Sequence, residues 1–188
     1  MHSRQEVILD LGPLLQHTPG QPAEVAATGE FYPPKELLAQ FDLATDGPLH
    51  YELLVTSAGD DDDFILEGSL SGVAVAECRR CLDPVRSEAE VPFWFAMEYQ
   101  PSDEPLYLYA PEEYEDDEWL VFGSRKVDFA ALLTQLFALE QPLTALCKED
   151  CLGLNEDGVN LNQHPELAKE AEEAQQSSPF AALKDILD

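Results

Sequence analysis

The amino-acid sequence predicts an α+β protein in which an antiparallel β meander, or a barrel-like sheet, packs against one main helix and is followed by a helical C-terminal tail. Three observations support this fold class. Strand-like runs rich in aromatic and β-branched residues fill the first half of the chain. One later segment has the apolar spacing of a helix that packs on a sheet. Segments rich in proline and glycine separate these runs, as expected for connections between strands.

Strands are expected where branched and aromatic residues alternate with polar ones. These segments are 5–11, 49–57, 64–70, 72–77 and 88–99, with a further short strand at 23–28. Residues 35–41 follow a double proline and fit either a short helix or an edge strand. The link at 58–63 is rich in aspartate, and we expect an exposed hairpin tip rather than a calcium loop, since the closing glutamate of an EF-hand is absent.

The main helix is expected to begin after Asp128, a suitable N-cap residue, and to end before Pro142. Its apolar residues lie at helical spacing and form one face, which we interpret as the face packed against the sheet. This face comprises Phe129, Leu132, Leu133, Leu136 and Phe137. Residues 100–118 before the helix are acidic and rich in proline, and they predict a surface loop. Residues 178–187 fit either a docking helix or a linear motif for a partner.

The length and composition indicate one globular domain over 1–162, followed by an acidic connector and a C-terminal helix over 163–188. The chain has 38 acidic and 10 basic residues, which give a net charge of −28. Such a charge repels nucleic-acid backbones at long range and disfavours broad, non-specific binding to them. It favours basic partners such as ribosomal proteins, although solubility alone also accounts for an acidic surface.

Neither an export signal nor a membrane span is expected from the sequence. Asp10, Gly12 and Pro13 interrupt the apolar run that begins at Val7-Ile8-Leu9, so no signal-peptide core forms there. No continuous apolar run is long enough to cross a bilayer. We therefore expect a cytoplasmic protein, in a compartment where thiols stay reduced and paired cysteines are more often metal ligands than disulfides.

The four cysteines form two tight pairs. Cys78 and Cys81 lie in a C-x2-C turn between two expected strands, and Cys147 and Cys151 follow the main helix. Two such pairs are a typical ligand set for tetrahedral zinc, because each pair supplies two thiolates to one ion. We predict one structural zinc site shared by all four cysteines; the alternatives are unliganded reduced thiols and locally oxidised pairs. A thioredoxin-type site is disfavoured, since its C-x2-C opens a helix.

Six of the ten basic residues lie close in sequence to the cysteines or to the start of the main helix. They are Arg79, Arg80, Arg86, Arg125, Lys126 and Lys148. Two roles are open for these cations. They balance the negative charge of the thiolates and of acidic neighbours, or they form a small basic surface that contacts RNA or a partner protein.

No catalytic site is predicted. The four histidines are His2, His17, His50 and His164, and they are scattered outside any nucleophile-elbow, phosphate-loop or zinc-protease motif. We interpret His164 as an exposed loop residue rather than a spare metal ligand. Carboxylates are too abundant for any pair to stand out as an acid–base couple. We therefore expect a protein that is not an enzyme and has no small-molecule substrate.

Four motifs follow one another along the chain: Cys78–Val85, the helix opened by Val127-Asp128-Phe129 and closed by Gln141-Pro142-Leu143, Cys147–Leu154, and Ser178–Leu183. In this order they resemble the YceD family, the large ribosomal RNA subunit accumulation proteins, over roughly residues 45–188. The resemblance implies a cytoplasmic, non-catalytic factor that supports accumulation of large-subunit ribosomal RNA. Its partners would be ribosomal proteins, assembly factors or precursor RNA. The rival interpretations are a metal-dependent RNA-processing hydrolase and a zinc-stabilised scaffold without an RNA role.

The chain departs from the family pattern in one respect. Many members have two further cysteines where Asn155 and Gly158 stand here, whereas Leu161-Asn162 still fits. The segment after Cys147 therefore cannot supply four cysteines by itself. Either the metal is shared between the two remaining pairs or metal binding has been lost, and we prefer the shared site because it uses both pairs.

Overall fold

The computed structural model describes residues 5–16, 23–57, 63–110 and 118–167. The chain divides into two compact units, of which unit 1 comprises Met1–Val75 and Arg86–Gln141, and unit 2 comprises Ala76–Val85 and Pro142–Asp188. The domain boundaries expected from the sequence stay a prediction. The expected hairpin tip at 58–62, the acidic stretch at 112–117 and the C-terminal helix at 178–187 lie outside the described residues.

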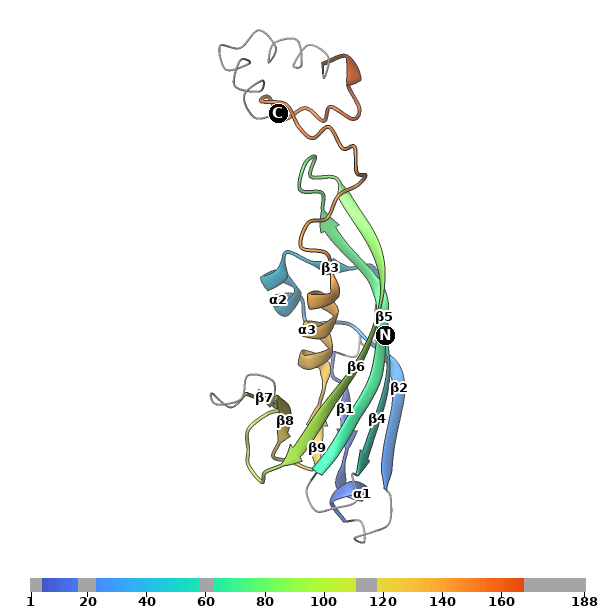
Figure 1. Ribbon diagram of the computed structural model, residues 1–188, viewed down its shortest axis with the longest axis vertical. Helices are drawn as coiled ribbons and strands as arrows, with labels where there is room; N and C mark the ends of the chain where they lie inside the picture. The colour runs from blue at the N-terminus through green and yellow to red at the C-terminus, as the bar shows by residue number, and fades with distance from the viewer. Residues whose placement is uncertain (1–4, 17–22, 58–62, 111–117, 168–188) are drawn as a thin grey trace, which may run out of the picture. The chain divides into compact units, whose positions relative to one another are not determined.

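The main sheet has seven strands in the order β2-β4-β5-β6-β8-β7, with the short strand β3 also paired to β5 (Figure 1). The strands are β2 (Glu24–Phe31), β3 (Ala44–Thr45), β4 (Leu49–Ser57), β5 (Asp63–Glu77), β6 (Pro84–Tyr99), β7 (Tyr107–Tyr109) and β8 (Trp119–Phe122). The sheet is open, with β2 and β7 at its edges, and it is not closed into a barrel. The predicted α+β class with a largely antiparallel sheet is confirmed.

The strands differ from the sequence-based expectation at 64–77, at the start of β6, and within the loop expected at 100–118, where β7 (Tyr107–Tyr109) pairs with β8. Residues 64–70 and 72–77, expected as two strands, belong to one continuous strand, β5. Strand β5 pairs with β4 up to Ser71 and with β3 at Ala74 and Val75, so it continues across Gly72 while its partner changes. Strand β6 begins at Pro84 rather than at 88, and its end pairs in parallel with β8. Of the two alternatives left open for residues 35–41, the structure has the helical one, as α2 (Lys35–Leu38) and the 3-10 helix η1 (Ala39–Phe41).

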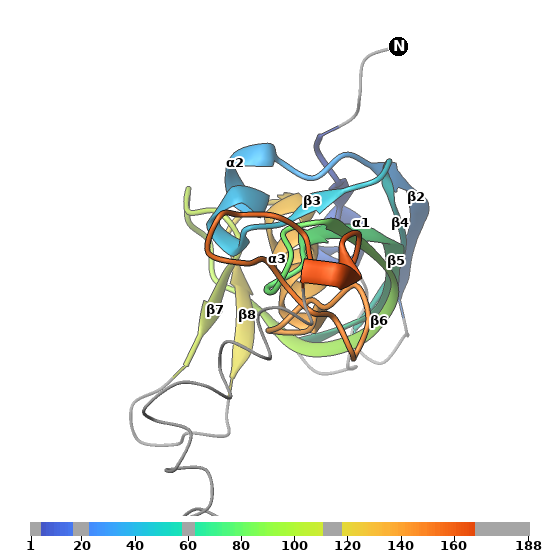
Figure 2. The ribbon, with the colours of Figure 1, turned by 90° about the horizontal axis from the view of Figure 1, so that it is seen from above.

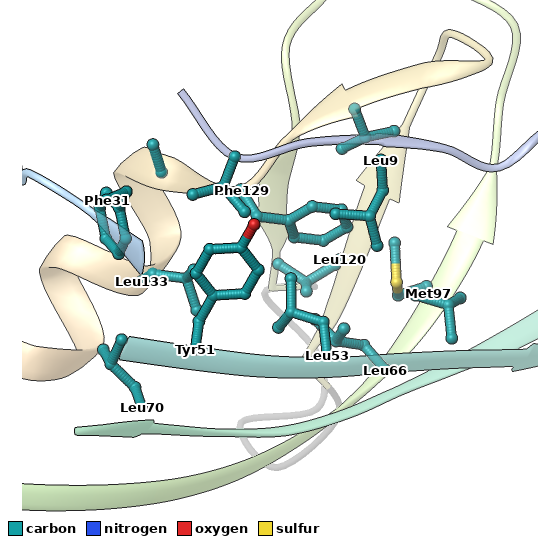
Figure 3. Packing of buried hydrophobic residues seen from close by; sticks show 14 of the residues in the cluster. Leu9, Phe31, Tyr51, Leu53, Leu66, Leu70, Met97, Leu120, Phe129 and Leu133 are labelled. Carbon is teal, nitrogen blue, oxygen red and sulfur yellow. The ribbon is translucent and has the colours of Figure 1, made fainter. Parts of the chain in front are cut away.

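The concave face of this sheet carries the core of unit 1. In β4, Leu49, Tyr51, Leu53 and Val55 are buried while His50 and Glu52 between them are exposed, which is the period-two alternation of a half-buried strand. Strands β2, β4, β5 and β6 curve around helix α3 (Ala130–Glu140) in the view from above (Figure 2). From α3, Leu133 and Phe137 are fully buried. Figure 3 shows Leu133 and Phe129 beside Tyr51 and Leu53 of β4.

Helix α3 begins and ends where local chemistry requires. The Asp128 carboxylate accepts hydrogen bonds from the N–H groups of Ala130 at 3.0 Å and Val7 at 2.9 Å, so it caps the helix, although Phe129 is the residue at the N-cap position. At the other end, Gln141 is extended because Pro142 follows it.

Strands β1 (Ile8–Asp10) and β9 (Lys126–Asp128) pair antiparallel, and a short helix α1 (Gly12–Leu15) follows β1. Within the described residues, no helix is long and apolar enough to span a bilayer.

Candidate metal centre

The first cysteine pair lies in the tight turn that joins β5 to β6. The N–H of Cys78 donates to the carbonyl of Asp83 at 2.9 Å, and the N–H of Leu82 donates back to the carbonyl of Cys78 at 2.9 Å. Leu82 has a φ of 63°, in the left-handed region that leucine rarely adopts. These constraints turn the chain sharply enough for the side chains of Cys78 and Cys81 to share one site.

The second pair is tied to the first by backbone hydrogen bonds. The N–H of Arg79 donates to the carbonyl of Ala145 at 2.9 Å, and the N–H of Leu154 donates to the carbonyl of Arg80 at 3.1 Å. Gly153 has a φ of 78°, and a Cβ at this position would lie 3.1 Å from the Arg80 carbonyl oxygen. Glycine therefore allows the loop around Cys151 to approach the C-x2-C turn closely.

The four sulfur atoms form one cluster within 4.8 Å of one another. The Sγ atoms of Cys78 and Cys151 are 3.9 Å apart, and those of Cys81 and Cys147 are 3.6 Å apart. Four thiolates on a tetrahedral zinc lie about 3.8 Å apart, since Zn–S bonds are about 2.3 Å long. A disulfide would need a separation near 2.05 Å, and all four cysteines are free. The geometry thus fits a four-thiolate zinc ion.

Hydrogen-bond donors surround the sulfur atoms. The backbone N–H groups of Arg80, Cys81 and Cys147 point to the Cys78 sulfur, and that of Asp83 points to Cys81. The Asn162 side-chain amide donates to the Cys151 sulfur at 3.2 Å, and its Oδ1 accepts the N–H of Leu152 at 3.0 Å. Donors of this kind stabilise thiolates and orient them toward a metal.

The four thiols differ in pKa because these hydrogen bonds, burial and the neighbouring thiols act on each of them differently. Hydrogen bonds from the N–H groups of Cys147, Arg80 and Cys81 lower the pKa of Cys78 to about 6. Burial opposes ionisation of Cys151, but the Asn162 amide, the Gly153 N–H and the other thiols bring its pKa below the ordinary value. The Asp83 N–H lowers the pKa of Cys81, yet burial and the three other thiols outweigh it and raise that pKa to about 12. Burial and the Cys151 thiol raise the pKa of Cys147.

This pattern is the one expected where several thiolates share one cation. Hydrogen bonds favour the thiolate forms of Cys78 and Cys151, and each further negative charge is opposed by those already present. A bound Zn²⁺ would supply the compensating positive charge and allow all four thiolates to form. Cys78, Cys81 and Cys151 are buried and form a small core with Val85, Leu146 and Leu154, while Cys147 is exposed. Four protein ligands leave no open coordination position, which is the arrangement of a structural zinc site.

The six predicted contact cations are divided between the two units. Arg79, Arg80 and Lys148 belong to unit 2, and Arg86, Arg125 and Lys126 belong to unit 1. Two of the unit 1 cations form ion pairs, Arg86 with Asp46 at 3.0 Å and Arg125 with Asp10 at 2.7 Å. All six are exposed.

Within unit 2, Arg80 and Arg79 play different parts. The Arg80 guanidinium donates to the carbonyls of Cys151 at 2.9 Å and Glu149 at 3.2 Å, so it fixes the second cysteine loop. Lys148 lies 3.8 Å from the Asp150 carboxylate. The side chain of Arg79 is exposed and has no ion-pair partner among the described residues. Arg79 is therefore the cation of this unit whose charge is left unpaired among the described residues.

Sequence reasoning missed the asparagines that support the cysteine cluster. Asn160 donates to the Asp83 carboxylate at 2.8 Å, and Asn162 contacts Cys151 directly. The spacing of Asn162 after the second pair was visible in the sequence, but nothing in that spacing indicated a hydrogen bond to sulfur. His164 interacts with Glu166 at 3.2 Å.

The two positions where many family members have cysteines form a turn here. The side-chain oxygen of Asn155 accepts the N–H groups of Asp157 at 3.0 Å and Val159 at 2.8 Å, and Gly158 adopts a φ of 77°. Leu154 and Asn160 are bridged across this turn. The turn directs the chain back so that Asn160 and Asn162 reach the cysteine cluster. These residues therefore shape the support of the site instead of supplying ligands.

Comparisons with known proteins identify the family of this chain. The model of the family described as large ribosomal RNA subunit accumulation protein YceD matches residues 66–187, a range that contains all four cysteines. Uncharacterized proteins from Mycobacterium bovis and from two strains of Mycobacterium tuberculosis are each 29% identical over 118 residues, which cover 62% of this chain. The chain spans about half of the length of these relatives, 53% in each case. No solved structure matches significantly. Since the family match extends over most of the chain, the protein belongs to the YceD family.

Proposed function

We propose that this protein is a non-catalytic, cytoplasmic factor that supports accumulation of large-subunit ribosomal RNA by binding a ribosomal protein, an assembly factor or precursor RNA. The match to the YceD family over residues 66–187 carries the proposal, because the name of that family refers to accumulation of this RNA. The matched range includes the whole cysteine cluster and helix α3.

The chemistry of the cysteine cluster supports a binding role over a catalytic one. A metal-dependent hydrolase keeps a coordination position open for water, usually beside carboxylate or imidazole ligands. Among the described residues, the four cysteines are the one group close enough to hold a metal ion, and they would fill its tetrahedral shell. We propose that the zinc holds the two loops of unit 2 in a fixed arrangement and thereby presents Arg79 for contact.

The test measures the ratio of large-subunit to small-subunit ribosomal RNA in cells that lack the protein and are supplied with variants. The unchanged chain should restore the ratio, Arg79→Glu should restore it poorly, and Arg79→Lys is the control that keeps the charge. Arg80→Glu is a less clean probe, since Arg80 also fixes the second cysteine loop. A ratio that does not fall when the protein is absent would refute the role. Complete loss on replacing a single Asp or Glu would favour the hydrolase instead.

A further inference from the structure

The main sheet has a second face, opposite the one that packs on α3. Strand pairing places Glu52 beside Ser69 and Leu54 beside Glu67, so these residues of β4 and β5 lie on the same side. In β6, Glu88, Glu90, Pro92 and Trp94 are exposed in alternation with Ala89, Val91 and Phe93, which are more buried. We call this surface the outer sheet face and define it by Glu52, Leu54, Glu67, Glu88, Glu90 and Trp94.

Trp94 is held on the outer sheet face by its neighbour. The ring of Phe93 lies over Gly68 of β5, where a Cβ would meet the ring at 2.6 Å, so only glycine leaves room for it. Phe93 therefore points toward the core, and Trp94 points the other way. The side chain of Trp94 is 59% exposed, and its indole N–H has no hydrogen-bond acceptor among the described residues. The other tryptophan, Trp119, donates to Glu98 at 2.8 Å.

The charged residues of the strands that form the outer sheet face are almost all acidic. Strands β2, β4 and β5 contain no lysine or arginine. Strand β6 contains one, Arg86, which pairs with Asp46 at 3.0 Å. His50 of β4 pairs with Glu30 of β2 at 3.2 Å. The carboxylates at 52, 67, 88 and 90 thus lack basic partners within the described part of the strands.

An exposed tryptophan in a field of unpaired carboxylates fits one kind of partner. Tryptophan is enriched among the residues that dominate binding energy, and its face attracts the guanidinium and ammonium groups of arginine and lysine. The carboxylates attract the same cations and repel phosphate backbones. We propose that the outer sheet face binds an extended lysine- and arginine-rich segment of a partner protein, with Trp94 and the carboxylates of Glu67, Glu88 and Glu90 on β5 and β6 as its contacts. The inference deepens the proposed function, since it assigns a surface to the basic protein partner.

The experiment titrates the full chain with a short labelled peptide in which lysine and arginine alternate with serine and valine. Binding is followed by fluorescence anisotropy and by the indole N–H signals of Trp94 and Trp119 in NMR spectra, with Trp94→Phe used to assign the two signals. We expect the Trp94 signal to move more than that of Trp119. Trp94→Ala should weaken binding about tenfold, and Glu88→Lys with Glu90→Lys should weaken it at least as much. Added salt should weaken binding of the unchanged chain.

The matched control is the pair Glu36→Lys and Glu140→Lys, which makes the same charge change on exposed residues of α2 and α3. If this pair weakens binding as strongly as the β6 pair, attraction is non-specific and the inference fails. It also fails if the peptide does not bind, if the Trp94 signal does not move, or if single-stranded RNA shifts that signal instead. These outcomes concern purified protein and a peptide. They are therefore independent of the ribosomal RNA ratio that tests the proposed function.

Discussion

Asn162 illustrates how single residues outside the ligand set determine the properties of the cysteine cluster. Its Nδ2 donates to the Cys151 sulfur at 3.2 Å while its Oδ1 accepts the Leu152 N–H at 3.0 Å, so the amide is held in one orientation. This bond is one cause of the lowered pKa of Cys151. A lower pKa favours the thiolate, which is the form that binds a metal.

Replacing Asn162 should therefore weaken zinc binding without removing a ligand. Asn162→Asp keeps the shape of the side chain but places an acceptor and a negative charge beside the thiolate. We expect the affinity for zinc to fall by about 10- to 100-fold, the usual effect of changing a residue that supports a ligand. Competition with a chromophoric chelator measures the affinity, and Asn155→Asp is the matched control, since Asn155 bonds only to backbone groups of its own turn. Equal affinities for Asn162→Asp and the unchanged chain would contradict this role.

Asp10 shows a second residue-scale effect, in unit 1. Arg125 donates to its carboxylate at 2.7 and 3.2 Å, and the Gly12 N–H donates at 2.9 Å. The Arg125 hydrogen bonds, and then that of Gly12, lower the pKa of Asp10 below its ordinary value of 3.8. A carboxyl with a lowered native pKa stabilises the folded state above the unfolded pKa and loses that contribution as the pH falls through the native value.

Asp10→Asn should therefore be less stable than the unchanged chain at neutral pH, and the gap should close in acid. Denaturant unfolding at neutral pH and at about pH 3 measures the gap. We expect a small difference, because the pair is exposed, and a smaller one when salt is added. If the difference in stability grew as the pH fell, the native pKa of Asp10 would not be lowered, and the prediction would be wrong.

Among the helices and strands, the sequence predicts those that have a pattern of apolar residues within their own segment. Strand β4 and helix α3 were found because alternating and helical apolar patterns do not depend on distant partners. The continuity of β5 was missed because it depends on β3 replacing β4 as a partner, which no pattern within residues 64–77 records. The parallel pairing of β8 with β6 was missed for the same reason. The meeting of the cysteine pairs was predicted, since ligand spacing encodes it, but the supporting asparagines were not.

The turn between β5 and β6 offers a test of a strained position. Leu82 adopts a φ of 63° and is 57% exposed, so its side chain contributes little packing while its backbone is disfavoured. Leu82→Gly should leave zinc binding intact and raise the free energy of unfolding by up to about 1 kcal/mol, measured in urea with zinc present. Leu152→Gly is the control, because Leu152 is similarly exposed, at 49%, but its backbone lies outside the left-handed region. We expect the Leu152→Gly variant to be less stable than the unchanged chain. If Leu82→Gly lost as much stability as Leu152→Gly, the backbone of Leu82 would not be strained and the prediction would be wrong.

At the scale of the whole molecule, the two units rely on different forces. Unit 1 has a large core around α3 that includes Phe31, Phe64, Phe122, Phe129 and Phe137. Unit 2 has a small core made of three cysteines with Val85, Leu146 and Leu154. A core of that size does not hold two loops together unaided, so the metal would carry much of the stability of unit 2.

Chelation should therefore affect the units unequally. With a strong chelator, hydrogen exchange of backbone amides should become fast over 76–85 and 142–167, whereas the amides of β4 and α3 should keep their protection. Re-adding zinc should restore the slow exchange. Protection that is lost equally in both units, or in neither, would contradict a separate, metal-held unit 2.

Four cysteines from two distant segments of the chain are positioned to bind one zinc ion. The most direct test combines metal analysis of protein purified without chelators with X-ray absorption at the zinc edge. We expect about one zinc per chain and four sulfur ligands at about 2.3 Å, with zinc lost in Cys78→Ser and in Cys151→Ser. Protein that neither contains zinc nor binds it when it is added, or a zinc shell containing oxygen or nitrogen ligands, would contradict this expectation.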